Sequence, residues 1–128
     1  MTLHSAILTV RALFELALYD ITNARFGFGG VSERLVRRCH ESSRRRSGSH
    51  DAIFDAVNLA SCLYFKPVRC WQRSVVAVRL LRKRGIPCDL VIGYRPSPFF
   101  SHAWVEIDGR IANDLPTYAE RLRVLQKL

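Results

Sequence analysis

Cysteine pairs at metal-binding spacing, long apolar runs and negative charge are all scarce in this sequence. The four cysteines stand at positions 39, 62, 70 and 88, and no two of them are separated by two residues, so a structural zinc site is not indicated. The apolar start of the chain is interrupted by Arg11 and Glu15, which excludes a membrane-spanning run of about 20 apolar residues. This start also lacks the basic region and cleavage site of a secretory signal. We therefore expect a cytoplasmic protein with reduced thiols.

The composition is that of an ordinary globular protein. The chain has 128 residues, of which 48% are hydrophobic and 24% are charged, enough for one small core and one domain. Twenty basic residues against 11 acidic ones give a net charge of +9. This charge permits a nucleic acid, an acidic peptide or an anionic surface as a partner.

The first half of the chain predicts helices. Apolar residues recur at helical spacing over residues 3–20. They are Leu3, Ile7, Val10 and Phe14, with Leu8, Ala12 and Leu16 widening the stripe. Glycines within residues 23–30 predict a break, and residues 31–40 a short basic helix with Ser32 as its N-cap. Residues 41–50 are polar throughout and predict a loop.

The second half predicts two more helices and then strands. Helices are expected over residues 51–63 and from residue 68 or 69 to 84, where Gly85 and Pro87 mark the end. The period then changes to that of strands, over residues 88–94, 102–107 and 110–115, with a turn at Asp108–Gly109. The fold class is therefore α+β. We divide it into N-terminal helices with a basic loop (residues 1–50) and a core (residues 51–128), within one compact domain.

Three residues in the core have the chemistry of thiol acyl transfer. Cys70 lies near the first turn of the long helix, where backbone N–H groups and the flanking Arg69 and Arg73 favour the thiolate. His102 lies on a predicted strand and Asp114 ends the next one. A nucleophile, a base and an orienting acid in this order are typical of a catalytic triad.

The hairpin turn decides whether His102 and Asp114 share a face. With a two-residue loop at Asp108–Gly109, Ile107 faces Arg110 and the two candidate residues point to opposite faces. With a three-residue loop, Glu106 faces Arg110 and Asp114 lies directly opposite His102. The sequence permits both loop lengths, and only the three-residue loop places His102 and Asp114 on the same face, as a triad requires.

Five motifs in the same order resemble those of a known family. They are Cys70-Trp-Gln-Arg-Ser, Arg-Gly85-Ile-Pro, Leu-Val-Ile-Gly93, His102-Ala-Trp-Val-Glu-Ile-Asp-Gly and Asn-Asp114. Over residues 51–118 the chain resembles the transglutaminase-like cysteine peptidases of lasso-peptide biosynthesis, the stand-alone B-proteins. The resemblance implies a papain-like core in which one nucleophile helix packs on a short antiparallel sheet.

The resemblance also implies a function, which is removal of the leader from a ribosomally made precursor peptide in the bacterial cytoplasm. Cys70 would be the nucleophile, His102 the general base and Asp114 the orienting acid. The Cys70 backbone N–H would stabilise the oxyanion. The implied partners are the precursor peptide, a small leader-recognition protein and an ATP-dependent lasso cyclase. No cofactor or metal is required, and a transglutaminase-like amide transfer is the alternative reaction.

Other features have alternative interpretations. The arginine-rich stretch Arg34–Arg46 would suit a nucleic-acid-binding or adaptor domain, but it lacks interleaved aromatic residues and a recognised motif, so no nucleic acid is expected. Residues 3–19 and 31–46 are the candidate docking surfaces for a partner, although the first helix can equally complete the core. We expect Cys62 and Cys88 to be core thiols, Trp104 a packing wall and Asp108 a turn former.

Overall fold

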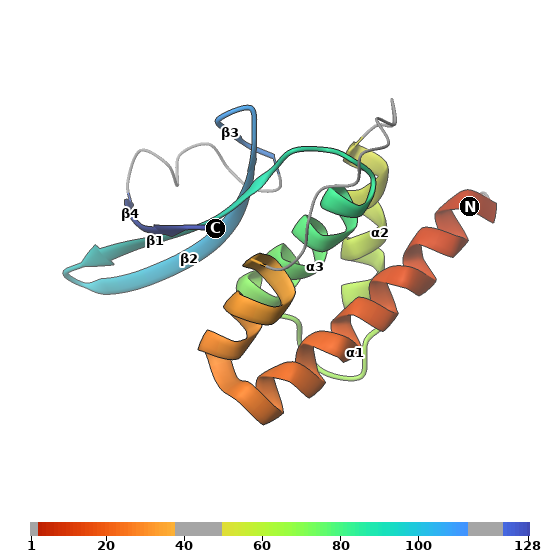
Figure 1. Cartoon of the computed structure of the whole chain (residues 1–128), viewed down its shortest axis with the longest axis horizontal. Coiled ribbons are helices and arrows are strands. Elements are labelled where there is room, and N and C mark those ends of the chain that lie inside the picture. The colour runs from red at the N-terminus through yellow and green to blue at the C-terminus, as the bar shows by residue number, and fades with distance from the viewer. Residues whose placement is uncertain (1–2, 38–49, 113–121) are drawn as a thin grey trace.

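The computed structural model describes residues 3–37, 50–112 and 122–128. Helices come first and strands follow. The elements are α1 (Leu3–Val31), the π-helix η1 (Ser32–Arg37), α2 (His50–Leu63), α3 (Cys70–Lys83), β1 (Asp89–Pro96), β2 (Phe99–Ile107), β3 (Arg110–Ile111) and β4 (Arg123–Lys127). The helices gather on one side of the sheet (Figure 1), which confirms the α+β class. None of the helices in these ranges is both long and apolar enough to cross a membrane.

The sheet is antiparallel, with strand order β3-β2-β1-β4. The two central strands form a hairpin that pairs from Asp89 with Glu106 to Pro96 with Phe99. β2 starts three residues earlier than predicted. β4 was not predicted, because its residues do not alternate between apolar and polar, and Val124 and Leu125 are exposed.

The helix α3 lies at the centre of the molecule. It contacts α1, η1, α2, β1 and β2. Its four consecutive residues Val75–Val78 are fully buried, the pattern of a helix enclosed on every side. Gly85 follows with φ of 76°, the left-handed conformation predicted for the residue after the helix. The position of the candidate nucleophile is therefore fixed by the most enclosed element of the fold.

The helix α1 is apolar on two faces. Leu8, Ala12 and Leu16 are buried against the other helices. The other part of the predicted stripe, which includes Leu3 and Phe14, is exposed. The structure thus shows that the first helix completes the core with one face and leaves a second apolar face uncovered.

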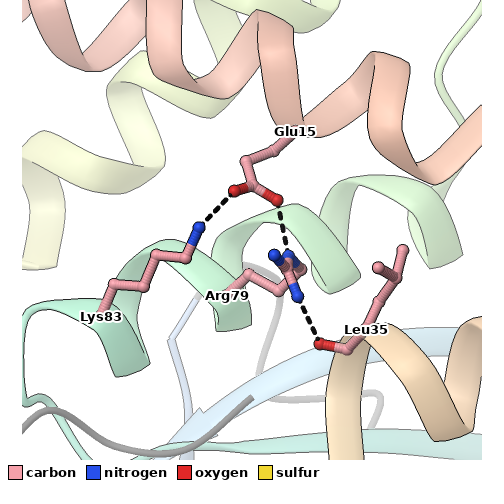
Figure 2. Close-up of polar contacts among 4 residues, drawn as sticks. All are labelled: Glu15, Leu35, Arg79 and Lys83. Atoms are coloured by element: carbon pink, nitrogen blue, oxygen red, sulfur yellow. Dashed lines mark hydrogen bonds and ion pairs between the residues drawn. The ribbon is translucent and has the colours of Figure 1, made fainter. Parts of the chain in front are cut away.

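A buried carboxylate joins α1 to α3. Glu15 accepts hydrogen bonds from Arg79 Nε at 2.5 Å and from Lys83 Nζ at 2.6 Å, and Arg79 also donates to the carbonyl of Leu35 at 2.9 Å (Figure 2). Burial acts to raise the pKa of Glu15, but the hydrogen bonds and positive charges of Arg79 and Lys83 outweigh it, so the pKa is lowered from 4.5. This network fixes the angle between α1, η1 and α3.

The predicted break over residues 23–30 is confirmed at Gly27. This residue leaves the helical conformation, with φ of 69° and ψ of −166°, and the chain kinks there between two helical segments before it continues into η1. The predicted short helix is present as η1, but Ser32 is not its N-cap, because it is the first residue of η1 and its buried hydroxyl has no hydrogen-bond partner within the described ranges.

Candidate active site

Cys70 is the first residue of α3 and its side chain is half-buried. The preceding residue, Arg69, has an extended backbone (φ −88°, ψ 166°), and its carbonyl accepts the first helical hydrogen bond, from Arg73 at 3.0 Å. No side chain of the N-cap residue bonds to the first turn, since arginine has no acceptor atom. The thiol therefore lies beside backbone N–H groups at the positive end of the helix dipole.

The start of α3 is anchored to β2. Ser74 Oγ donates a hydrogen bond to the carbonyl of Ala103 at 3.3 Å. One turn further on, the carbonyl of Val78 lies 3.9 Å from Sγ of Cys88. Cys88 is the residue before β1, and the first residue of β1, Asp89, pairs with Glu106. Ser74 is therefore level with Ala103, and Val78, one turn later, is near the Glu106 end of β2. The helix α3 and the strand β2 thus run in the same direction.

This geometry brings Cys70 and His102 to the same end of the contact between α3 and β2. Cys70 is one turn before Ser74, about 6 Å back along the helix axis. His102 is one residue before Ala103, about 3.3 Å back along the strand. In Figure 1 the first turn of α3 likewise lies next to β2, whereas its last turn lies away from that strand.

The helix α3 meets β2 at the edge that faces β3. The carbonyl of Val105 points to that edge, since it accepts the N–H of Ala112 at 2.8 Å. The carbonyl of Ala103, two residues earlier, points the same way, and it is the acceptor for Ser74. Along β2 the side chain of His102 alternates with that of Ala103, so it lies on the same face as Trp104, opposite the helical core. The structure therefore brings Cys70 and His102 to the same end of α3 and β2 but leaves their direct pairing a prediction.

The imidazole of His102 belongs to a row of three rings on one face of β2. The ring of Phe100 is stacked 6.1 Å from it and that of Trp104 6.4 Å from it. Trp104 packs with Val91 and Leu122 on the face of the sheet opposite the helical core. The row restricts the rotation of His102, whose side chain is half-buried.

Trp104 is itself held in place. Its indole Nε1 donates to Glu106 at 2.9 Å, and Glu106 pairs with Lys127 of β4 at 3.3 Å. Gly93 lies directly opposite His102 on β1, and a Cβ atom there would be 2.5 Å from the Trp104 ring. The absence of a side chain at Gly93 thus lets the indole lie across β1. Trp104 is fully buried, which confirms it as a packing wall.

A polar cluster joins the helices behind Cys70. Asp20 accepts a hydrogen bond from the hydroxyl of Tyr64 and pairs with Lys66 at 2.6 Å. Gln72 donates to Asp20 at 3.4 Å and to the carbonyl of Leu16 at 3.3 Å. Burial and the bond to Asp20 raise the pKa of Tyr64 to about 12, so its phenol remains a donor at neutral pH. The side-chain amide of Gln72 thus points towards α1 and joins α3 to that helix by hydrogen bonds.

Two aromatic residues lie close to the nucleophile position. Burial, and then the charges of Asp20 and Cys70, raise the pKa of Tyr19 above its ordinary value. Trp71 packs against Phe28, with ring centroids 4.7 Å apart. Sequence patterns did not predict Tyr19 and Phe28 as neighbours of this position, because they come from α1, far from Cys70 along the chain.

The turn between β2 and β3 corrects the predicted register. Ile107 pairs with Arg110, and Asp108 and Gly109 both have positive φ, 54° and 76°, so the loop has two residues and not three. This confirms Asp108 as a turn former but removes the hairpin argument for placing Asp114 opposite His102. Asp114 lies outside the described residues, and its role stays a prediction.

The other thiols differ from each other. Cys88 is buried, as expected, but Cys62 is exposed on α2, so its assignment to the core is wrong. Cys39 lies outside the described residues. Within the ranges that the structure describes, no three His, Cys, Asp or Glu side chains lie close enough to hold a metal ion.

A large hollow in the described part of the chain lies away from the candidate site. It has a volume of about 680 Å³ and is lined by Arg37, Arg82, Asp89, Glu106 and Lys127, with five further residues. It lies at the opposite end of β2 from His102 and carries charges of both signs. It therefore contains neither Cys70 nor His102.

Comparison with known proteins identifies the family of this chain. The family model described as "Transglutaminase-like superfamily" matches residues 16–127. Over 59 residues the chain is 41% identical to the Microcin J25-processing protein McjB of Escherichia coli, and the match covers 46% of this chain and 28% of that relative. The chain thus covers much less than two thirds of the relative's length, and no solved structure matches. Because the family match includes nearly the whole chain, this protein belongs to the transglutaminase-like superfamily.

Proposed function

We propose that this protein is a cysteine peptidase that removes the leader from a lasso-peptide precursor. The observation that carries the proposal is the position of Cys70, a half-buried thiol at the first residue of α3, one turn before Ser74, whose hydroxyl donates to the carbonyl of Ala103, the residue after His102. The name of the similar protein, which processes microcin J25, supports peptide processing. The full activity, the substrate and the partners are part of the proposal.

The proposed reaction uses Cys70, His102 and Asp114 as a triad. His102 accepts the thiol proton while Sγ of Cys70 attacks the scissile carbonyl carbon. The tetrahedral intermediate collapses to a thioester as the C–N bond breaks, and His102 returns the proton to the leaving amine. Water then attacks the thioester, giving its proton to His102, and the released carboxylic acid leaves Cys70 free. Asp114 would hold the imidazole in the required tautomer.

The positive end of α3 supports the first step. Backbone N–H groups and the helix dipole stabilise the thiolate, and the N–H of Cys70 itself would donate to the oxyanion. No cofactor or metal takes part in these steps. A leader-recognition protein would hold the precursor, and an ATP-dependent cyclase would close the released core peptide.

The test is cleavage of the protein's own precursor in the presence of its leader-recognition protein, followed by mass spectrometry. Cys70→Ala should abolish cleavage and thioester formation. Cys62→Ala is the matched control, because it removes an exposed thiol from another helix and should leave the rate unchanged. Cleavage that persists in Cys70→Ala and is lost in Cys62→Ala would move the nucleophile to α2.

The products distinguish hydrolysis from amide transfer. A leader that ends in a free carboxylate identifies water as the second nucleophile. A leader that carries the mass of an added amine would identify a transferase and overturn the peptidase assignment, while leaving Cys70 as the nucleophile.

A further inference from the structure

The outer face of α1 carries a narrow stripe of exposed apolar side chains. Their exposed fractions are 79% for Leu3, 51% for Ile7, 51% for Val10, 74% for Phe14 and 61% for Ile21. The opposite face of the same helix is already buried in the core. A contiguous apolar surface of this kind on a soluble domain marks an interaction site.

The spacing of the stripe indicates that its partner is an α-helix. Its members follow one another at steps of four, three and four residues from Leu3 to Phe14, and Ala17 and Ile21 continue the alternation. Such a repeat, which averages 3.5 residues, is the seam that packs against a second α-helix. The seam is about 27 Å long. A shallow hollow of about 470 Å³ along it, bounded by Ile7, Val10 and Phe14, provides space for inserted side chains.

The charged residues beside the seam indicate the charge of the partner helix. The exposed charged or titratable side chains of α1 are His4, Arg11 and Arg25. Its two acidic residues are used inside the protein, Glu15 by Arg79 and Lys83, and Asp20 by Lys66. Within the length of the seam, Arg11 is therefore an exposed positive charge without a compensating exposed acidic group on the same helix, which favours an acidic helix as the partner.

The same charges disfavour pairing of two copies of this chain. Arg11 lies almost at the midpoint of the seam between Leu3 and Ile21. Two seams packed antiparallel would place the two Arg11 side chains on the same flank, within about 3 Å along the axis, so like charges would meet at the centre of the contact. In a parallel pair the two Arg11 side chains would lie on opposite flanks, where no acidic side chain of the same helix would face them.

We infer that the outer face of α1 is the docking site for an acidic amphipathic α-helix of a partner protein. Apolar residues of that helix pack between Leu3, Val10 and Phe14, and its acidic residues pair with Arg11. This interaction does not depend on Cys70, so it can be tested separately from catalysis.

The experiment uses two synthetic peptides of about three heptads, both with leucine at positions a and d. One peptide has glutamate at positions e and g, and the other has lysine, so that repulsion keeps each from pairing with itself. Fluorescence anisotropy with the full chain measures binding. The glutamate peptide should bind, with an affinity that falls as salt increases, and the lysine peptide should bind at least about ten-fold more weakly.

Three variants locate the site. Phe14→Asp should weaken binding of the glutamate peptide about ten-fold or more, because it places a charge in the seam. Phe65→Asp is the matched control, since Phe65 is 83% exposed but lies outside α1, and it should bind normally. Arg11→Glu should reverse the preference between the two peptides. Unchanged circular dichroism in all three variants ensures that the fold is intact.

Four results would overturn the inference. Equal affinity for both peptides would remove the charge argument, and binding insensitive to Phe14→Asp would place the contact elsewhere. Dimers of the chain alone that Phe14→Asp dissociates in sedimentation would identify a second copy as the occupant. Co-sedimentation with phosphatidylserine vesicles that Phe14→Asp abolishes would identify a membrane surface.

Discussion

Glu15 is a carboxylate in the helical core that forms ion pairs with both Arg79 and Lys83. Its side chain is only 10% exposed, as is typical of a carboxylate that is fully paired, and its partner Arg79 is 13% exposed. Removing the carboxylate would leave a buried guanidinium without its counter-ion. The loss of one member of such a pair is more damaging than the absence of the whole pair, because the remaining charge has lost its hydration.

We predict that Glu15→Gln lowers the free energy of unfolding by about 3 kcal/mol at neutral pH. The folded pKa of Glu15 lies below the unfolded value near 4.5, so its contribution is present above that pH and is lost as the pH falls through the folded pKa. The difference from wild type should therefore shrink in acid. Denaturant unfolding at several pH values measures it, with Asp51→Asn, in an exposed pair with His50, as a nearly neutral control.

Asp114 is the member of the proposed triad that depends entirely on the family resemblance. We predict that Asp114→Asn reduces cleavage on the order of 10⁴-fold, as in the serine triad, by allowing the wrong imidazole tautomer. Asp108→Asn is the control, because asparagine tolerates the positive φ of 54° at that turn position. Cleavage that is lost in Asp108→Asn but kept in Asp114→Asn would exclude Asp114 from the triad.

At the scale of elements, the pairing of β1 with β2 depends on one missing side chain. A Cβ atom at Gly93 would lie 2.5 Å and 2.7 Å from two ring atoms of Trp104 and 3.0 Å from Leu122. The indole cannot move without losing its bond to Glu106 or disturbing the ring row that includes His102. A side chain added at Gly93 of β1 would therefore shift the Trp104 ring and, through it, the candidate base His102.

We predict that Gly93→Ala destabilises the protein by about 1–3 kcal/mol through overpacking and alters the near-ultraviolet circular dichroism of Trp104. Cleavage should fall as well, because His102 stacks on that ring. Gly29→Ala is the matched control, since a methyl group added there would meet no atom within 4 Å and the φ of Gly29 is not positive. A wild-type spectrum and stability in Gly93→Ala would show that β1 adapts to the added methyl group.

The elements differ in how far the sequence predicts them. The helix α3 was predicted to within two residues at its start, because Gly85 and Pro87 end it locally and the apolar pattern is strong. The turn was predicted in position but not in register, since Asp108–Gly109 suits both loop lengths. β4 has no signal of its own and exists through pairing with β1, a contact between distant segments.

The candidate site shows the same division between local and distant information. Local motifs predicted Cys70 at the start of a helix and His102 on a strand. Asp20 and Gln72 were not predicted as neighbours, because their contact joins α1 to α3 across 52 residues of sequence. Tertiary contacts of this kind leave no periodic signal in a single sequence.

At the scale of the whole molecule, the segments before and after residue 50 share one core. Buried residues from α1, η1, α2, α3, β1 and β2 form a single apolar cluster. Polar contacts cross the same boundary, because Arg79 donates to the carbonyl of Leu35 and Arg82 to that of Val36. Arg82 also donates to the carbonyls of Cys88 and Leu128, so one guanidinium connects η1, α3 and the two adjacent strands.

We therefore predict that residues 51–128 do not fold without residues 1–50. The shorter chain would expose the buried residues of α3 and leave Arg79 and Arg82 without their acceptors, a loss larger than the stability of most small domains. The full chain should unfold in one cooperative transition, whereas residues 51–128 should lack near-ultraviolet circular dichroism and show no cooperative transition in denaturant. A folded 51–128 fragment with a cooperative transition of its own would show instead that this half of the chain is an independent domain.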